Sequence, residues 1–207
     1  MKLYGYWRSS SAWRVRLGLG LKGLDYDYVA VHLKNGEQLG DEHGARNPLH
    51  QVPVLELDDG TRLTQSLAIL EWLEETHPEP ALLPAAPLAR ARCRALAEIV
   101  NSGIQPVQNL SVLLTVQALG GDRMAWGRQA IQRGLDAMET HVSGLDTPFL
   151  CGEAPTLADI LLVPQLYNAR RFACDLSTVP TLTAVEARCE ALPAFQAAHP
   201  SAQPDAF

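Results

Sequence analysis

Three consecutive serines, Ser9, Ser10 and Ser11, follow a short aromatic stretch and open a helical pattern, and Arg8 comes directly before them. A helix N-terminus presents free backbone N–H groups and the positive end of the helix dipole. A serine at that position either caps the helix or shares those donors with a bound anion. Capping explains any one of these serines, but three of them beside an arginine favour an anion-binding site.

A second strand-to-helix junction carries Gln65 and Ser66. The Ser66 hydroxyl and the backbone N–H groups at this helix start are suited to a carboxylate. Two such junctions in one small domain predict a ligand with an anion at each of two points. Glutathione has this form, with a thiolate at one point and a γ-glutamyl carboxylate some distance away.

The elements that position these junctions are typical of a small α/β domain. A strand at 2–7 leads into a helix at 12–22 that Gly23 ends, and a second strand follows within 25–33. The strand–helix–strand order predicts a parallel pair. Two further strands flank a turn at Asp58-Asp59-Gly60, and a helix over 67–75 completes a domain that we place at residues 1–77.

A break follows this domain. Four prolines lie within residues 78–87, which we interpret as a linker. Residues 88–207 show helical periodicity without a convincing strand, and they predict an all-helical domain. Within it, Thr156 and Asp159 form a capping-box pattern at the start of an apolar run, which predicts a buried central helix that Pro164 would kink.

The composition limits the functions open to the chain. Its 207 residues are 47% apolar and 19% charged, which is typical of a globular protein. A net charge of −6 disfavours nucleic acid and anionic membranes, so an anionic substrate requires a local basic pocket. The four cysteines are scattered without metal-ligand spacing, which argues against a zinc site and a disulfide framework. We find no leader and no membrane-spanning run, and we expect a cytoplasmic protein.

Six segments together resemble the zeta class of glutathione transferases, the maleylacetoacetate isomerase family. They read SSSAWRVR, NPLHQVPVLEL, QSLAILEWLEE, GIQPVQNLSVL, TLADILLVPQ and QPD, and the likeness runs from about Lys2 to Asp205. The resemblance implies the glutathione transferase fold, in which a thioredoxin-like N-terminal domain precedes an all-helical C-terminal domain. It also implies a homodimer that binds glutathione mainly through its N-terminal half.

The resemblance assigns roles to single residues of the N-terminal half. Ser9 faces the glutathione sulfur, and Ser10 and Ser11 complete its loop. Gln38 and Val52 line the tripeptide, and a cis bond to Pro53 positions the Val52 backbone. The γ-glutamyl end is bound by Gln65 and Ser66.

The helical half receives roles from the same resemblance. Gln105, Asn109 and Ser111 close the glutathione site. Arg171, together with Arg8, is matched to arginines near the carboxylates of the second substrate, and the two arginines are expected to meet between the domains.

Three arginines and one serine leave questions open. Ser11 stands where the family usually has a cysteine, so chemistry that needs a protein thiol there is excluded. Arg170 either enlarges the cationic pocket or faces solvent. Because Arg14 and Arg16 lie two positions apart on a helix, at least one of them is expected at the surface or in a dimer contact.

The function implied is a glutathione-dependent cis–trans isomerisation of maleylacetoacetate in aromatic amino acid catabolism. The glutathione thiolate adds to a cis-enone, the former double bond rotates, and elimination leaves the trans isomer. A maleyl diketo acid brings two carboxylates, which gives the arginines an electrostatic role. Three alternatives stay open: a maleylpyruvate isomerase, a general glutathione transferase, and a non-catalytic binding protein of the same fold.

Overall fold

The computed structural model describes all 207 residues, which form two compact units. The first unit contains residues 1–82 and 192–207, and the second contains residues 83–191. The sequence pattern assigns 192–207 to the helical domain, whereas in the structure this segment packs with the first unit. The physical reason is its helix α9 (Pro193–Ala198), which packs against α1 (Ser10–Leu21).

The first unit contains a four-stranded mixed sheet with the order β2-β1-β3-β4. β1 pairs in parallel with β2, as predicted, and antiparallel with β3, while β3 and β4 form the predicted hairpin. Leu3 and Leu55 are fully buried partners at the centre of this sheet. The strands are β1 (Lys2–Gly5), β2 (Asp27–Ala30), β3 (Val54–Glu56) and β4 (Arg62–Thr64).

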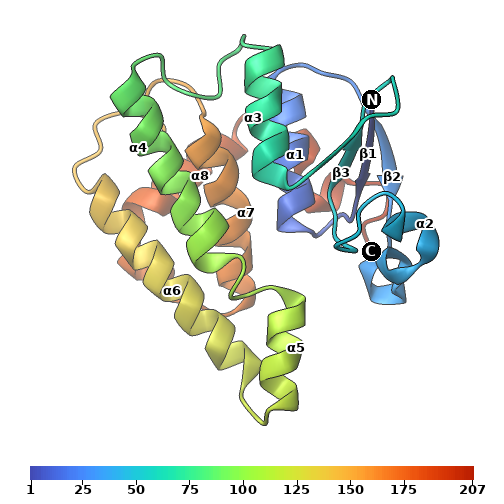
Figure 1. Cartoon of the computed structure of the whole chain (residues 1–207). Helices are drawn as coiled ribbons and strands as arrows, with labels where there is room; N and C mark the ends of the chain where they lie inside the picture. Colours follow the sequence, from blue (N-terminus) through green and yellow to red (C-terminus); the bar gives the residue numbers. More distant parts are fainter. The chain divides into compact units, whose positions relative to one another are not determined.

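Two helices lie side by side next to the sheet, α1 and α3 (Ser66–Thr76) (Figure 1). They approach closely at Gly18, where a Cβ atom would lie 2.3 Å from a methyl carbon of Leu70. A larger residue at position 18 would therefore push the helices apart. The remaining short elements of the unit are η1 (Leu33–Asn35), η2 (Glu37–Leu39), α2 (Asp41–Gly44) and η5 (Pro200–Ala202).

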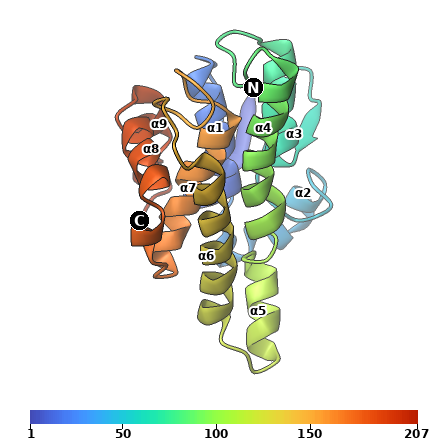
Figure 2. The ribbon, with the colours of Figure 1, turned by 90° about the vertical axis from the view of Figure 1, so that its left-hand side faces the viewer.

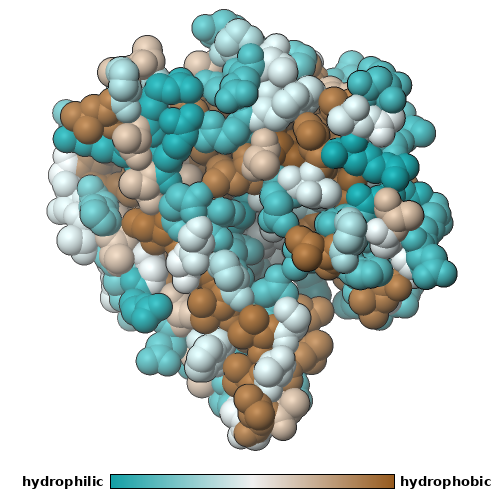
Figure 3. Space-filling view, in the orientation of Figure 1, coloured by the Kyte–Doolittle hydropathy of each residue, from teal (hydrophilic) through white to brown (hydrophobic).

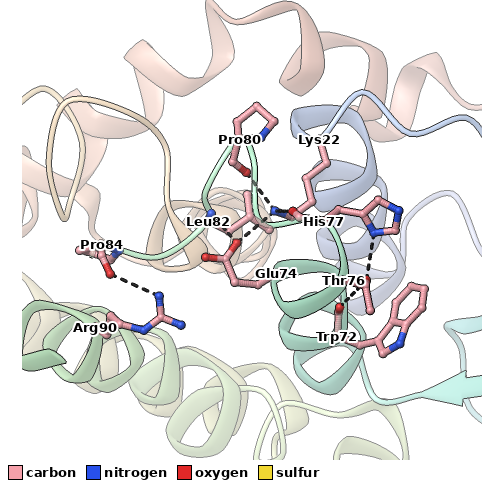
Figure 4. A network of polar contacts seen from close by, with 9 residues as sticks. All are labelled: Lys22, Trp72, Glu74, Thr76, His77, Pro80, Leu82, Pro84 and Arg90. Atoms are coloured by element: carbon pink, nitrogen blue, oxygen red, sulfur yellow. Dashed lines mark hydrogen bonds and ion pairs between the residues drawn. The ribbon is translucent and has the colours of Figure 1, made fainter. Parts of the chain in front are cut away.

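A buried cation ties the end of α3 to α1 (Figure 4). The Lys22 ammonium donates to Glu74 Oε2 at 3.0 Å, to the His77 carbonyl at 2.6 Å and to the Pro80 carbonyl at 2.9 Å. These three acceptors match the three N–H donors of a lysine. Glu74 Oε2 also accepts the Leu82 N–H at 2.7 Å, so the first half of the proline-rich linker is held against the first unit.

The second unit is all-helical, as predicted. Its central helix α7 buries most of its residues and packs against both α4 and α8. The predicted capping box is confirmed, because the Asp159 carboxylate accepts the Thr156 N–H at 2.7 Å and the Thr156 side chain accepts the Asp159 backbone N–H. The Thr156 hydroxyl also donates to Asp159 Oδ2 at 2.8 Å, and the helix continues through Pro164. The elements are α4 (Pro87–Glu98), η3 (Ile99–Ile104), α5 (Leu110–Ala118), α6 (Arg123–Val142), α7 (Leu157–Arg171), η4 (Leu176–Thr178) and α8 (Pro180–Glu190).

Helix α5 forms an antiparallel pair with α6 and buries only Leu113 (Figure 2). Its exposed apolar side chains include Leu110 and Leu114, with Leu119 just beyond its end, and apolar residues gather over α5 in Figure 3. α5 therefore contributes little to the core of the second unit. None of the helices combines the length and the apolar character that crossing a bilayer requires.

Candidate functional site

Ser9 is the N-cap of α1. Its Oγ accepts the Ala12 N–H at 3.3 Å, and its own N–H donates to the Tyr6 carbonyl at 2.9 Å. Because the oxygen already accepts from the helix, the hydroxyl hydrogen can be donated to another group. The side chain is half-buried, so the capping role does not prevent it from contacting a ligand.

The neighbouring predicted residues lie at the same helix start. Ser10 and Ser11 are the first two residues of α1; Ser10 is buried and Ser11 is half-buried. The Arg8 guanidinium lies 5.3 Å from the centre of the Trp7 ring, in a cation–π contact. A cation and a helix N-terminus therefore flank Ser9, and both favour a negative charge.

The second junction is linked to the first helix by a buried arginine. Arg14 Nη1 donates to the Ser66 hydroxyl at 3.4 Å, and both residues are buried. Ser66 begins α3, and Gln65 before it has a positive φ of 68°. Non-glycine residues in that region of backbone space gather at ligand sites. The N-terminus of α3 thus combines free N–H groups, a hydroxyl and a nearby positive charge, as a carboxylate site requires.

The expectation that Arg14 or Arg16 lies at the surface is wrong for the isolated chain, since both are 1% exposed. α1 is covered by α3 on one side and by α9 on another, so residues two apart both find partners. Arg16 Nε donates to the Ala198 carbonyl at 3.1 Å, and its Nη2 donates to the Trp7 carbonyl at 2.9 Å. Burial lowers the pKa of its guanidinium from the usual value.

Gln38 is held close to the segment that carries Val52. The Gln38 carbonyl accepts the His50 Nδ1–H at 2.8 Å, and the buried Oε1 of its side chain has no partner in the chain. The Val52–Pro53 bond is cis, as expected. Two residues of this loop escaped prediction: buried His43 and Asn47 both donate to the Gln51 carbonyl, at 3.0 and 2.9 Å.

In the second unit, the predicted residues gather around the start of α5. The Asn109 side chain caps α5 by accepting the Ser111 N–H and hydroxyl, each at 3.1 Å. Gln105 directly follows the π-helical turn η3, a distortion that recurs at functional sites. Its Nε2 donates to Gln165 Oε1 at 3.1 Å. The role of these residues in closing the glutathione site stays a prediction.

Gln165 is a further residue that sequence reasoning missed. It is fully buried, and its Oε1 also accepts the Gln108 Nε2–H at 2.9 Å. The signal was present in the sequence, because a lone glutamine interrupts the apolar run LLVPQL. Such a buried amide requires partners, and here it fixes the orientation of two glutamines beside α5.

The two adjacent arginines at the end of α7 have different partners. Arg170 forms a two-pronged ion pair with Glu186 of α8, at 2.6 and 2.5 Å. The Arg170 side chain is 50% exposed, which agrees with the solvent-facing alternative drawn from sequence, and Glu186 engages its charge. Arg171 is exposed and donates to Asn168 Oδ1 at 3.1 Å.

None of the predicted site residues is a cysteine. All four cysteines are free, and Cys93 and Cys189 are buried. Burial raises the pKa of the Cys189 thiol above its ordinary value, which keeps it protonated. No group of three or more histidine, cysteine or acidic side chains is arranged to hold a metal ion.

Two family models match the chain. The N-terminal domain of glutathione S-transferases matches residues 8–76, and the C-terminal domain matches residues 63–200. Among curated proteins, maleylacetoacetate isomerase of Rattus norvegicus is 45% identical over 205 residues, which cover 98% of this chain and 94% of that protein.

Solved structures agree with these matches. Maleylacetoacetate isomerase from Anaeromyxobacter dehalogenans 2CP-1, with glutathione in its active site, is 60% identical with a TM-score of 0.91, covering 100% of this chain and 97% of the other. The same protein was also solved with dicarboxyethyl glutathione and citrate in the active site. A bacterial zeta-class maleyl pyruvate isomerase is 45% identical with a TM-score of 0.96, and both chains are covered completely.

Proposed function

This chain belongs to the glutathione S-transferase family, and we propose on that premise that it is a zeta-class enzyme that isomerises maleylacetoacetate to fumarylacetoacetate with glutathione. The observation that carries this proposal is the 60% identity, over the whole chain, to a maleylacetoacetate isomerase with glutathione in its active site. It is joined by the geometry of the first unit, where two helix N-termini present a hydroxyl beside a cation.

The residues of the first unit fit glutathione. The unpartnered Oε1 of Gln38 is suited to an N–H group of the tripeptide, and Ser66 with Arg14 behind it is suited to the γ-glutamyl carboxylate. When bound, glutathione supplies a thiolate that adds reversibly to the cis double bond. A free cysteine thiol has a pKa of ~8.5, so donors at this point enlarge its reactive fraction at neutral pH. Ser9 acts as such a donor and not as a base.

Two arginines, Arg8 and Arg171, are assigned to the binding of the second substrate. The related Anaeromyxobacter enzyme was crystallised with dicarboxyethyl glutathione and citrate, which both carry several carboxylates. A maleyl diketo acid has a carboxylate at each end and develops enolate charge during the reaction. We assign Arg8 and Arg171 to these charges, because the resemblance matches both to arginines near the carboxylates of the second substrate and guanidinium groups pair strongly with carboxylates.

Maleylpyruvate is the second candidate substrate. It is favoured by the TM-score of 0.96 to a zeta-class maleyl pyruvate isomerase whose length this chain matches completely. A general conjugating transferase uses the same glutathione site without needing the arginines. A non-catalytic binding protein is disfavoured by the intact Ser9, Gln65 and Ser66.

Steady-state assays with each substrate test this assignment. We expect glutathione-dependent isomerisation of both maleyl acids, with the higher kcat/KM for maleylacetoacetate. S-methyl glutathione should support no turnover, because its sulfur cannot form a thiolate. A higher kcat/KM for maleylpyruvate would reverse the order of the two candidates. Retention on glutathione-agarose without turnover of either acid would instead support the non-catalytic alternative.

We also propose a homodimer located in the cytoplasm, where glutathione keeps thiols such as the four free cysteines reduced. The family resemblance and the symmetry of most soluble oligomers support the dimer. Sedimentation at micromolar concentration should give about twice the chain mass of 22.6 kDa. A single species at the chain mass would exclude the dimer under those conditions.

A further inference from the structure

The segment of residues 203–207, called here the 203–207 segment, contacts several elements of the first unit. Gln203 is buried, and its Nε2 donates to the carbonyls of Ala197 and His199, at 2.9 and 3.0 Å, which fixes the start of the segment to the end of α9. Asp205 Oδ2 then accepts the Trp7 N–H at 3.0 Å and the Tyr28 hydroxyl at 3.2 Å. The segment thus joins the end of β1 to β2.

The peptide groups of Trp7 are held on both sides by opposite charges. Asp205 accepts the Trp7 N–H, while Arg16 Nη2 donates to the Trp7 carbonyl at 2.9 Å. Trp7 lies two residues before Ser9, inside the turn in which the Ser9 N–H donates to the Tyr6 carbonyl. The direction in which the chain leaves β1 and enters the cap of α1 is therefore set by this pair of charged side chains.

Arg16 also limits the electrostatic effect of the Asp205 carboxylate. A lone carboxylate near the Ser9 turn would disfavour a thiolate bound there, because like charges repel. The guanidinium of Arg16 donates to the Trp7 carbonyl and lies 6.0 Å from the centre of the ring of Tyr28, whose hydroxyl donates to Asp205. A positive and a negative side chain therefore both bind the peptide groups of Trp7, so the negative charge of Asp205 does not act on the turn alone.

The same segment packs on the buried cluster that contains Val52, another predicted glutathione contact. Ala206 packs on a buried group of apolar side chains that includes Trp7, Val31 and Val52. The centre of the Phe207 ring lies 5.5 Å from the centre of the Trp7 ring, and Lys34 Nζ lies 4.3 Å from the centre of the Phe207 ring. Lys34 belongs to η1, which leads into the turn that bears Gln38.

We propose that the 203–207 segment is a positioning element of the glutathione site, and that it acts through the Asp205 carboxylate on the turn that carries Ser9. The proposal rests on the role of Ser9 in the proposed function. Asp205 acts without touching the ligand: it fixes the Trp7 peptide, and the peptide fixes the direction of the Ser9 hydroxyl. A displacement of about 1 Å at a reacting group can lower the rate by as much as 10²-fold.

Three variants test the proposal. Asp205→Ala removes the acceptor, and Asp205→Asn keeps an oxygen that can accept the same two donors. Asp175→Ala is a matched control in the second unit, because Asp175 also accepts one backbone N–H and one hydroxyl, both from Ser177, at 2.9 and 2.6 Å. For each variant we would measure kcat, the glutathione Kd, the ultraviolet absorbance of the bound thiolate, the unfolding midpoint, and amide hydrogen exchange of residues 6–12.

We expect Asp205→Ala to lower kcat by about 10- to 100-fold, with a smaller change in the glutathione Kd. In this variant the absorbance of the bound glutathione thiolate should appear only at a higher pH than in the wild type. The amide hydrogens of residues 6–12 should exchange faster. Asp205→Asn should retain most of the activity. Asp175→Ala should retain all of the activity while its unfolding midpoint is comparable to that of Asp205→Ala. Wild-type kcat in Asp205→Ala would overturn the proposal, as would an equal loss of kcat in Asp205→Asn.

The hydrogen-exchange measurement separates this proposal from the proposed function. If the wild-type chain neither binds glutathione nor isomerises a maleyl acid, the proposed function fails. Exchange at 6–12 in the ligand-free variants still reports whether Asp205 fixes the Ser9 turn. Unchanged exchange in a folded Asp205→Ala variant would contradict the positioning role even if the wild-type enzyme is active.

Discussion

Replacing Ser9 by alanine should lower turnover by about 10² to 10³, the loss that follows removal of one donor to a developing anion. The half-buried hydroxyl of Ser9 accepts from the Ala12 N–H and has its hydrogen available for the sulfur. Because Gln38, Val52 and Ser66 are unchanged in this variant, the glutathione Kd should change far less than kcat. Stopped-flow turnover and equilibrium titration of the same preparation measure both quantities.

The capping role of Ser9 must be separated from this catalytic role. Alanine at an N-cap costs about 0.5–2 kcal/mol of stability, whereas glycine costs only a few tenths. Ser9→Gly should therefore lose turnover as Ser9→Ala does while keeping more of its stability, and Ser9→Thr should keep a hydroxyl donor. Unchanged turnover in Ser9→Ala and Ser9→Gly would remove Ser9 from the mechanism and direct attention to Ser10 and Ser11.

Local patterns predicted the elements that carry the site. The strand–helix–strand order correctly predicted that β1 and β2 pair in parallel, and the Asp58-Asp59-Gly60 turn correctly predicted the β3–β4 hairpin. Ser9 was found as a helix start, because a cap is a feature of the few residues beside it. The mixed sheet followed by a helical unit confirmed the glutathione transferase fold that the resemblance implied.

Errors arose where a side chain has a partner far along the sequence. Arg16 is buried because the Ala198 carbonyl, 182 residues later, accepts from it, and no periodicity within α1 reveals that partner. For the same reason residues 192–207 belong to the first unit and not to the helical domain, because α9 packs against α1. Arg170 was left undecided for the same reason, since Glu186 lies on another helix. The burial of charge depends on tertiary pairing, which local sequence does not contain.

Replacing Arg171 by methionine should remove most of the activity toward a maleyl diketo acid and leave conjugation of a small neutral electrophile nearly intact. A hydrogen bond between charged groups contributes roughly 1.5–3 kcal/mol, which corresponds to one or two decades in kcat/KM. Arg171 is exposed at the end of α7, where its guanidinium donates to Asn168 Oδ1, and the resemblance matches it to an arginine near a carboxylate of the second substrate. The two kcat/KM values, measured side by side, report the change in specificity.

Arg170 provides the matched control, because it is the adjacent residue of the same type and its charge is already engaged. Its guanidinium forms a two-pronged pair with the buried Glu186. Arg170→Met should therefore lower stability, by leaving a buried carboxylate without its partner, while the ratio of the two activities stays unchanged. If Arg171→Met lowered both activities together, Arg171 would be structural. If it lowered neither, the substrate would carry one carboxylate or none, and the general transferase would become the better assignment.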